Sequence, residues 1–121
     1  MTISKTILVV DDNVINRLLP GLILRPFGWH VYESENGVDA LEQLQKHQIS
    51  CVLLDISMPD ISGLEVLSDL RKNKAFAALK IVAYTAYATQ ADVAHLTSIG
   101  FDAVLIKPLT SRTLLDVLNF Y

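Results

Sequence analysis

Residues 52–59 of this chain read Val52-Leu53-Leu54-Asp55-Ile56-Ser57-Met58-Pro59, an apolar run that ends in one acid and a turn. A run of this kind is typical of a strand that is buried on both faces of a parallel sheet. An acid that comes directly after such a strand lies at the mouth of the sheet and adds little to packing. We therefore expect Asp55 to be the reactive residue, with the other functional groups of the chain held around it.

The composition predicts one globular domain that spans residues 1–121, with no output domain attached. About half of the residues, 51%, are hydrophobic, which argues for a packed core. No apolar run approaches the roughly 18 residues that cross a bilayer, and the amino-terminus lacks the apolar segment of a signal peptide. Cys51 is the only cysteine, which excludes an internal disulfide, and the net charge of −3 comes without a basic run. We therefore expect a cytoplasmic protein that binds neither nucleic acid nor membrane.

Apolar, β-branched runs alternate with helical patterns along the chain. The expected strands cover about residues 7–10, 30–34, 51–54, 80–84 and 103–106. The expected helices begin near residues 14, 38, 63, 89 and 111, and Pro20 should kink or unwind the first of them. This alternation predicts an α/β fold, a doubly wound five-stranded parallel sheet with helices on both faces. In such folds the site lies beyond the carboxyl ends of the strands, where the winding changes direction.

Polar residues stand at the carboxyl ends of four of the five expected strands: Asp11 and Asp12, Asp55, Thr85 and Lys107. Three carboxylates at one mouth repel each other unless a cation offsets their charge. Mg²⁺ suits such a site, because it takes oxygen ligands and binds through one or two carboxylates together with phosphate. Lys107 adds a positive charge and Thr85 a hydroxyl donor, and both would stabilise a phosphoryl group on a carboxylate. The pattern predicts an aspartyl phosphate at Asp55.

The same residues carry a family resemblance. Over nearly its whole length the chain resembles the receiver domains of two-component response regulators. The matching motifs are Val10-Asp11-Asp12-Asn13, Leu54-Asp55 with Met58-Pro59 and Gly63, Thr85-Ala86, and Lys107-Pro108. The resemblance implies a flavodoxin-like, CheY-like fold with strand order 2-1-3-4-5. It also implies a cis peptide bond between Lys107 and Pro108.

The resemblance implies a role for each acid of the cluster. Asp55 would accept a phosphoryl group from a histidine of a sensor kinase or of a histidine phosphotransfer protein. Asp12 and Asp55 would bind Mg²⁺ directly, together with the backbone carbonyl of Ser57, and Asp11 would act largely through water. A second resemblance, of residues 12–17 to the receivers of hybrid kinases, implies that the phosphoryl group arrives through a phosphorelay.

The resemblance also implies how the phosphate is read. Thr85 and Lys107 would contact the phosphoryl group and shift the face formed by the fourth helix, the fifth strand and the fifth helix. A downstream partner would read this face, which relatives also use to form homodimers. Such a domain is not an enzyme in the metabolic sense, because it would catalyse only its own phosphoryl transfer and slow dephosphorylation.

The chain departs from the family pattern at one switch position. Family members commonly carry Tyr or Phe three residues before the lysine, where this chain has Val104. We therefore expect the readout to rely on Thr85, loop movement and Tyr87. The alternative is a degenerate receiver that acts as a phosphorylation-independent docking module, and Val104 is the residue that favours it.

Two other classes fit the sequence less well. A flavin-binding electron carrier of the same fold needs a Ser/Thr/Gly-rich phosphate cradle after the first strand, where this chain has acids. A phosphohydrolase with an aspartyl-phosphate intermediate usually has a second acid two residues after the nucleophile, where this chain has Ser57. The aromatic residues Trp29, Tyr32 and Tyr84 are interpreted as packing residues. The three histidines show no metal-ligand spacing and are interpreted as surface residues.

Overall fold

The computed structural model describes residues 5–58, 60–86 and 88–118, so the first four residues, Pro59, Tyr87 and the last three residues lie outside the described ranges. Within these ranges the chain forms five strands and five α-helices in alternation. The strands are β1 (Thr6–Val10), β2 (His30–Ser34), β3 (Cys51–Asp55), β4 (Lys80–Thr85) and β5 (Ala103–Ile106). The helices are α1 (Val14–Leu24), α2 (Gly37–Lys46), α3 (Gly63–Lys72), α4 (Gln90–Ser98) and α5 (Ser111–Leu118). None of the described helices has the length and apolar character that crossing a membrane requires.

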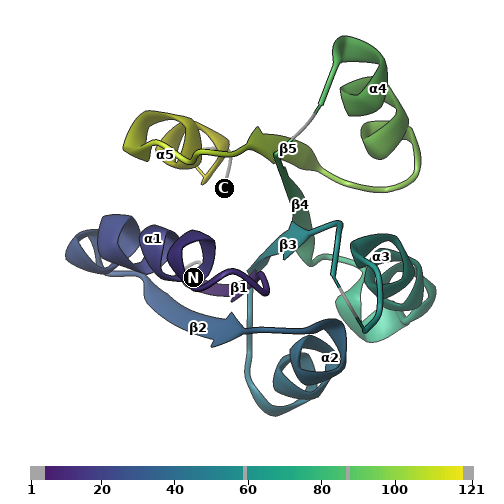
Figure 1. Ribbon diagram of the computed structural model, residues 1–121. Coiled ribbons are helices and arrows are strands. Elements are labelled where there is room, and N and C mark those ends of the chain that lie inside the picture. Colours follow the sequence, from purple (N-terminus) through teal and green to yellow (C-terminus); the bar gives the residue numbers. More distant parts are fainter. Residues whose placement is uncertain (1–4, 59, 87, 119–121) are drawn as a thin grey trace.

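The strands pair in parallel in the order β2-β1-β3-β4-β5, which confirms the predicted doubly wound fold and its strand order. Helices α1 and α5 cover one face of the sheet, and α2, α3 and α4 cover the other (Figure 1). The winding reverses at β1, because β2 lies on one side of it and β3 on the other. The carboxyl ends of β1 and β3 therefore meet at the position where this fold class binds its ligands.

The central strand β3 is buried along its whole length, as its apolar run predicts. Its residues alternate between the two layers of the core: Leu53 packs with the α1 and α5 side, and Leu54 with the α2, α3 and α4 side. Asp55 is the last residue of the strand and not the first residue beyond it, a difference of one position from the expected boundary. Burial on both faces leaves the carboxyl edge as the part of this strand where a polar side chain can reach solvent.

Helix α1 is continuous from Val14 to Leu24, so the unwinding expected at Pro20 does not occur. Proline removes one backbone donor, the one that would bond to the carbonyl of Asn16, while the neighbouring turns keep theirs. Pro20 is also buried against the core, so packing supports the helix at this point. The chain leaves the helix through a 3-10 turn at Arg25–Phe27 that ends at Gly28 with a φ of 87°.

The loop after Asp55 is held by an unusually close approach of Gly63, the first residue of α3. The backbone N–H of Gly63 donates a hydrogen bond to the carbonyl of Ile56 at 3.2 Å. A Cβ atom on Gly63 would collide with the backbone carbonyl of Asp55 and lie 2.6 Å from Cα of Ile56. Backbone atoms cannot rotate away as the end of a side chain can, so this contact requires glycine.

We predict that Gly63→Ala lowers the free energy of unfolding by about 2 kcal/mol, the typical effect of overpacking a tight contact. Urea denaturation measures this change. Gly21→Ala is the matched control, because its Cβ would meet the flexible guanidinium of Arg25 at 2.6 Å inside a helix that favours alanine. Equal stability of the two variants would show that the close approach at Gly63 is not a constraint.

Candidate functional site

The carboxyl edge of the sheet brings together the acids that the sequence analysis singled out. Asp11 and Asp12 directly follow β1, and Asp55 ends β3. The three side chains each place a carboxylate oxygen within 4.8 Å of the others. Asp11 is fully buried and Asp55 is 5% exposed, whereas Asp12 faces solvent. The cluster is therefore buried at Asp11 and Asp55 and accessible to solvent at Asp12.

Lys107 reaches this cluster from the loop after β5. Its Nζ lies 2.7 Å from Oδ2 of Asp11 and 3.6 Å from Oδ2 of Asp55. Among the described residues, Oδ2 of Asp11 is a buried oxygen without a hydrogen-bond partner, so the ion pair with Lys107 is what offsets its charge. The backbone also fixes Lys107, whose N–H donates to the carbonyl of Thr85 at 2.8 Å. The predicted cis peptide bond between Lys107 and Pro108 is confirmed.

Local backbone hydrogen bonds orient the two buried carboxylates. The N–H of Asn13 donates to Oδ1 of Asp11 at 2.9 Å, and the N–H of Ser57 donates to Oδ1 of Asp55 at 3.0 Å. Each acid thus accepts a bond from the residue two positions later, which is the usual behaviour of aspartate at the start of a turn. In both cases the remaining oxygen, Oδ2, is the one that faces Lys107.

The surroundings of Asp55 raise its pKa to about 6, and burial is the largest cause. The N–H of Ser57 lowers the pKa and the charge of Asp11 raises it, while Lys107 and Asp12 have smaller effects of opposite sign. At neutral pH the group is therefore mainly ionised, but its charge is poorly solvated. A carboxylate in this state gains from a nearby cation.

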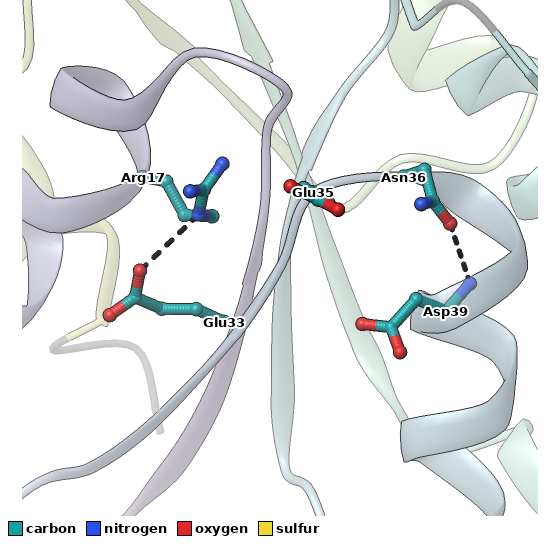
Figure 2. Close-up of a pocket in the computed structure, with 5 residues that line it drawn as sticks. All are labelled: Arg17, Glu33, Glu35, Asn36 and Asp39. Carbon is teal, nitrogen blue, oxygen red and sulfur yellow. Dashed lines mark hydrogen bonds and ion pairs between the residues drawn. The ribbon is translucent and has the colours of Figure 1, made fainter.

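Arg17 supports the acidic turn from the first helix, a role that the sequence analysis did not assign. Its Nη1 donates to the backbone carbonyl of Asp11 at 2.9 Å, and its Nε lies 3.4 Å from the carboxylate of Glu33 on β2. Arg17 also lines a polar cleft of about 340 Å³. Figure 2 shows Arg17 and Glu33 on one side of this cleft and Asn36 and Asp39 on the other. Arg17 lies within the motif of residues 12–17, but the motif gives no sign of which carbonyl it binds.

The loop after β3 is tied to the second helix through Asp60. Its two carboxylate oxygens accept hydrogen bonds from the backbone N–H groups of Gly37 and Val38, both at 3.1 Å. The pKa of Asp60 lies below its usual value, mainly because of the backbone N–H of Ile61 and further because of these bonds from Val38 and Gly37. They occupy the free donors at the start of α2 and fix the position of the loop that carries Ser57.

The other predicted site residues fall at this edge in different ways. Thr85 ends β4 and is buried beside the cluster, whereas Ser57 is exposed in the loop after β3. Val104, the residue that replaces the usual aromatic, is half-buried against the core layer of α2, α3 and α4. Tyr87, which was expected to take part in the readout, lies outside the described residues.

Tyr84 also belongs to this site, although the sequence analysis interpreted it as a packing residue. It pairs with Asp55 in the register of β3 and β4 and is fully buried. The centre of its ring lies 4.8 Å from Nζ of Lys107. Burial, with smaller effects from Asp11 and Asp55, raises the pKa of Tyr84 to about 12, so its phenol is neutral. A strand pattern alone cannot separate such a residue from an ordinary core aromatic.

We predict that Asp55→Asn stabilises the metal-free protein at pH 7.5 by about 2 kcal/mol. The pKa of Asp55 is higher in the folded state, about 6, than its ordinary value of 3.8. The folded state therefore binds the extra proton, and wild-type stability falls as pH rises from about 4 through 6. The advantage of the variant should accordingly vanish near pH 4. Urea denaturation in a chelator at both pH values measures the difference.

Asp60→Asn is the control of opposite sign. It removes the charge of a carboxylate whose pKa is lowered in the folded state, so it should destabilise the protein at pH 7.5. If Asp55→Asn is no more stable than wild type at pH 7.5, the charge of Asp55 is already fully compensated.

Comparisons with known proteins agree with this geometry. The family model of the response regulator receiver domain matches residues 7–119. Polar-differentiation response regulator DivK of Brucella anthropi is 27% identical to this chain, and the match covers 97% of this chain and 95% of DivK. DivK of Brucella ovis is 26% identical, and the match covers 98% of this chain and 96% of DivK. The receiver domain of a sensor histidine kinase from Pseudomonas aeruginosa, solved with magnesium coordinated in the active site cleft, has a TM-score of 0.86 at 25% identity over 98% of both chains. The Vibrio cholerae chemotaxis protein CheY4 shares the fold, with a TM-score of 0.89 at 24% identity over 98% of both chains.

Proposed function

The chain belongs to the family of response regulator receiver domains, and on this basis we propose that Asp55 accepts a phosphoryl group from a phosphohistidine of a partner protein. The observation that carries the proposal is the position of Lys107, whose ammonium lies between Asp11 and Asp55 at the carboxyl edge of the sheet. This arrangement places an ionised acceptor next to a positive charge that can follow the phosphoryl oxygens. A packing role explains neither the buried acids nor the lysine that joins them.

In the proposed reaction an ionised oxygen of Asp55 attacks the phosphorus atom. A P–O bond to Asp55 forms while the P–N bond to the partner's imidazole breaks, and its electron pair stays on the nitrogen. Lys107 neutralises charge on the transferred oxygens, and the hydroxyl of Thr85 donates a hydrogen bond to one of them. The N–H of Ser57 holds Oδ1 of Asp55 and so fixes the orientation of the carboxylate during attack.

The carboxylate cluster fits Mg²⁺ by the chemistry of its donors. It offers hard oxygen ligands within 4.8 Å of one another, and burial leaves the charge of Asp55 poorly solvated. Asp12 and Asp55 would hold the ion with the backbone carbonyl of Ser57, and Asp11 would act through water. When bound, the ion supplies positive charge to the transferred phosphoryl group.

The surface beside the cluster supports a protein as the phosphoryl donor. Helix α1 begins two residues after Asp12 and carries large apolar side chains that face solvent: Ile15 is 70% and Leu22 71% exposed. A histidine that reaches Asp55 brings its own protein against this helix. The donor fits a sensor histidine kinase or a histidine phosphotransfer protein, as expected from the sequence.

We propose that the signal leaves through the face formed by α4, β5 and α5, where a downstream partner or a second copy of the chain binds. Val104 and Ile106 of β5 line a hollow of about 330 Å³ with Thr113 and Val117 of α5, and Ile106 is 47% exposed. Val104 fills less of this region than the usual aromatic. It favours the alternative, a docking module that works without phosphorylation, and the first experiment below separates the two.

We predict that acetyl phosphate with Mg²⁺ adds one phosphoryl group to the wild-type protein and none to Asp55→Asn. Intact mass spectrometry measures the adduct, and omission of Mg²⁺ should prevent it. Asp69→Asn is the matched control, because it removes an exposed acid of α3 that lies outside the site and should leave labelling intact. A folded wild-type protein that takes up no phosphoryl group would favour the docking module.

We further predict that Mg²⁺ stabilises the folded state and that Asp12→Ala abolishes this effect. At ten times the dissociation constant the melting temperature of wild type should rise by about 3 to 6 °C. Differential scanning calorimetry measures the shift. Asp69→Ala removes an equal charge from the exposed surface of α3 and should keep the full response. A response that survives in Asp12→Ala would place the ion elsewhere.

A further inference from the structure

Packing in the core explains why an apolar ring is buried at Tyr84, but it does not explain why the residue carries a hydroxyl group. It is fully buried at the end of β4, on the side of the sheet covered by α1 and α5. Among the described residues its hydroxyl has no hydrogen-bond partner. A buried hydroxyl without a partner costs about 1 to 3 kcal/mol, so an aliphatic residue would satisfy packing alone at lower free energy.

The ring of Tyr84 faces the ammonium of Lys107. The distance of 4.8 Å from Nζ to the ring centre lies within the range of a cation–π interaction. The Lys107 side chain is only 14% exposed, and such interactions strengthen as the cation loses water. An ammonium has three N–H donors, and here its surroundings are Oδ2 of Asp11, Oδ2 of Asp55 and the ring.

These three attractions respond differently to the proposed reaction. Phosphoryl transfer converts Asp55 into an acyl phosphate, and a bound cation competes with Lys107 for the charge of Asp11. The electrostatic attraction of the ring does not change in either event. Nζ lies closer to Asp11, at 2.7 Å, than to Asp55, at 3.6 Å. The carboxylates alone would therefore draw the ammonium toward Asp11, and a third partner can hold it near Asp55.

We infer that Tyr84 is a positioning residue, whose ring face keeps the ammonium of Lys107 beside Asp55 while the charges of the carboxylates change. The inference rests on the proposed function and extends it to a residue outside the acid, lysine and threonine set. Tyr84 acts through Lys107 and does not itself touch the phosphoryl group. The ring is the active part, so phenylalanine should replace it and leucine should not.

The first test compares Tyr84→Phe with Tyr84→Leu in the rate of labelling by acetyl phosphate at saturating Mg²⁺. We expect the Phe variant to match wild type within about twofold and the Leu variant to be slower by about tenfold, as for loss of a desolvated cation–π contact. Phe101→Leu is the control for loss of a buried ring far from the site, since Phe101 precedes β5 at the opposite edge of the sheet. It should lower stability and leave the rate unchanged.

A double-mutant cycle tests whether Tyr84 acts through Lys107. In a Lys107→Met background the change Tyr84→Leu should slow labelling no further. An undiminished slowing in that background would overturn the inference, because Tyr84 would then act on another group. Equal rates for wild type and Tyr84→Leu, or equal slowing by Tyr84→Phe and Tyr84→Leu, would overturn it as well.

A second readout does not depend on phosphorylation. Nuclear magnetic resonance of lysine-labelled protein reports the ε-methylene group of Lys107, assigned by its loss in Lys107→Arg. We expect an upfield ring-current shift in wild type and in Tyr84→Phe that disappears in Tyr84→Leu. An unshifted Lys107 signal in wild type would overturn the inference. A wild type that shows the shift but takes up no phosphoryl group would overturn the proposed function instead, so the two failures are distinguishable.

Discussion

The ion pairs that one ammonium makes with two buried carboxylates are the interaction on which this molecule depends. Lys107 follows the fifth strand, Asp11 follows the first and Asp55 ends the third, so the contact requires β1, β3 and β5 to be in place in the sheet. Removing Lys107 would leave two buried carboxylates without the cation that offsets their charge, which is strongly destabilising. The arrangement thus links strand order to the site: the same contact requires these strands to be paired and, in the proposed function, prepares Asp55 to react.

Much of this could be predicted from the sequence because strand ends in a parallel sheet are unambiguous. An apolar run that stops at an acid, as at Asp55, fixes both the strand and the side of the sheet where the acid lies. Other features depend on contacts between elements that have no sequence period. Tyr84 looks like any core aromatic until the register places it beside Asp55, and Arg17 looks like a surface residue until α1 docks. The unwinding expected at Pro20 is absent for a related reason, since burial of this residue in the core outweighs the loss of one helical hydrogen bond.

The two sides of the sheet contribute differently to the site. Tyr84 stands on the side of α1 and α5 and contacts Lys107, whereas Val104 stands on the side of α2, α3 and α4, where family members usually carry an aromatic. Among the described residues, the aromatic ring that faces Lys107 therefore lies on the layer opposite to Val104. Helix α5 packs on the layer of Tyr84, so the lysine and this helix share a neighbour in the core.

The glycine at the start of α3 limits how sequences of this fold can vary. Its α-carbon lies so close to the main chain after Asp55 that one hydrogen atom is all that fits there. The next residue, Leu64, is exposed and can be replaced more readily. Any other residue at position 63 would require the backbone of the turn after Asp55 to move. The turn after Asp55 thus depends on the absence of a side chain at Gly63, and substitutions are easier at exposed positions such as Leu64.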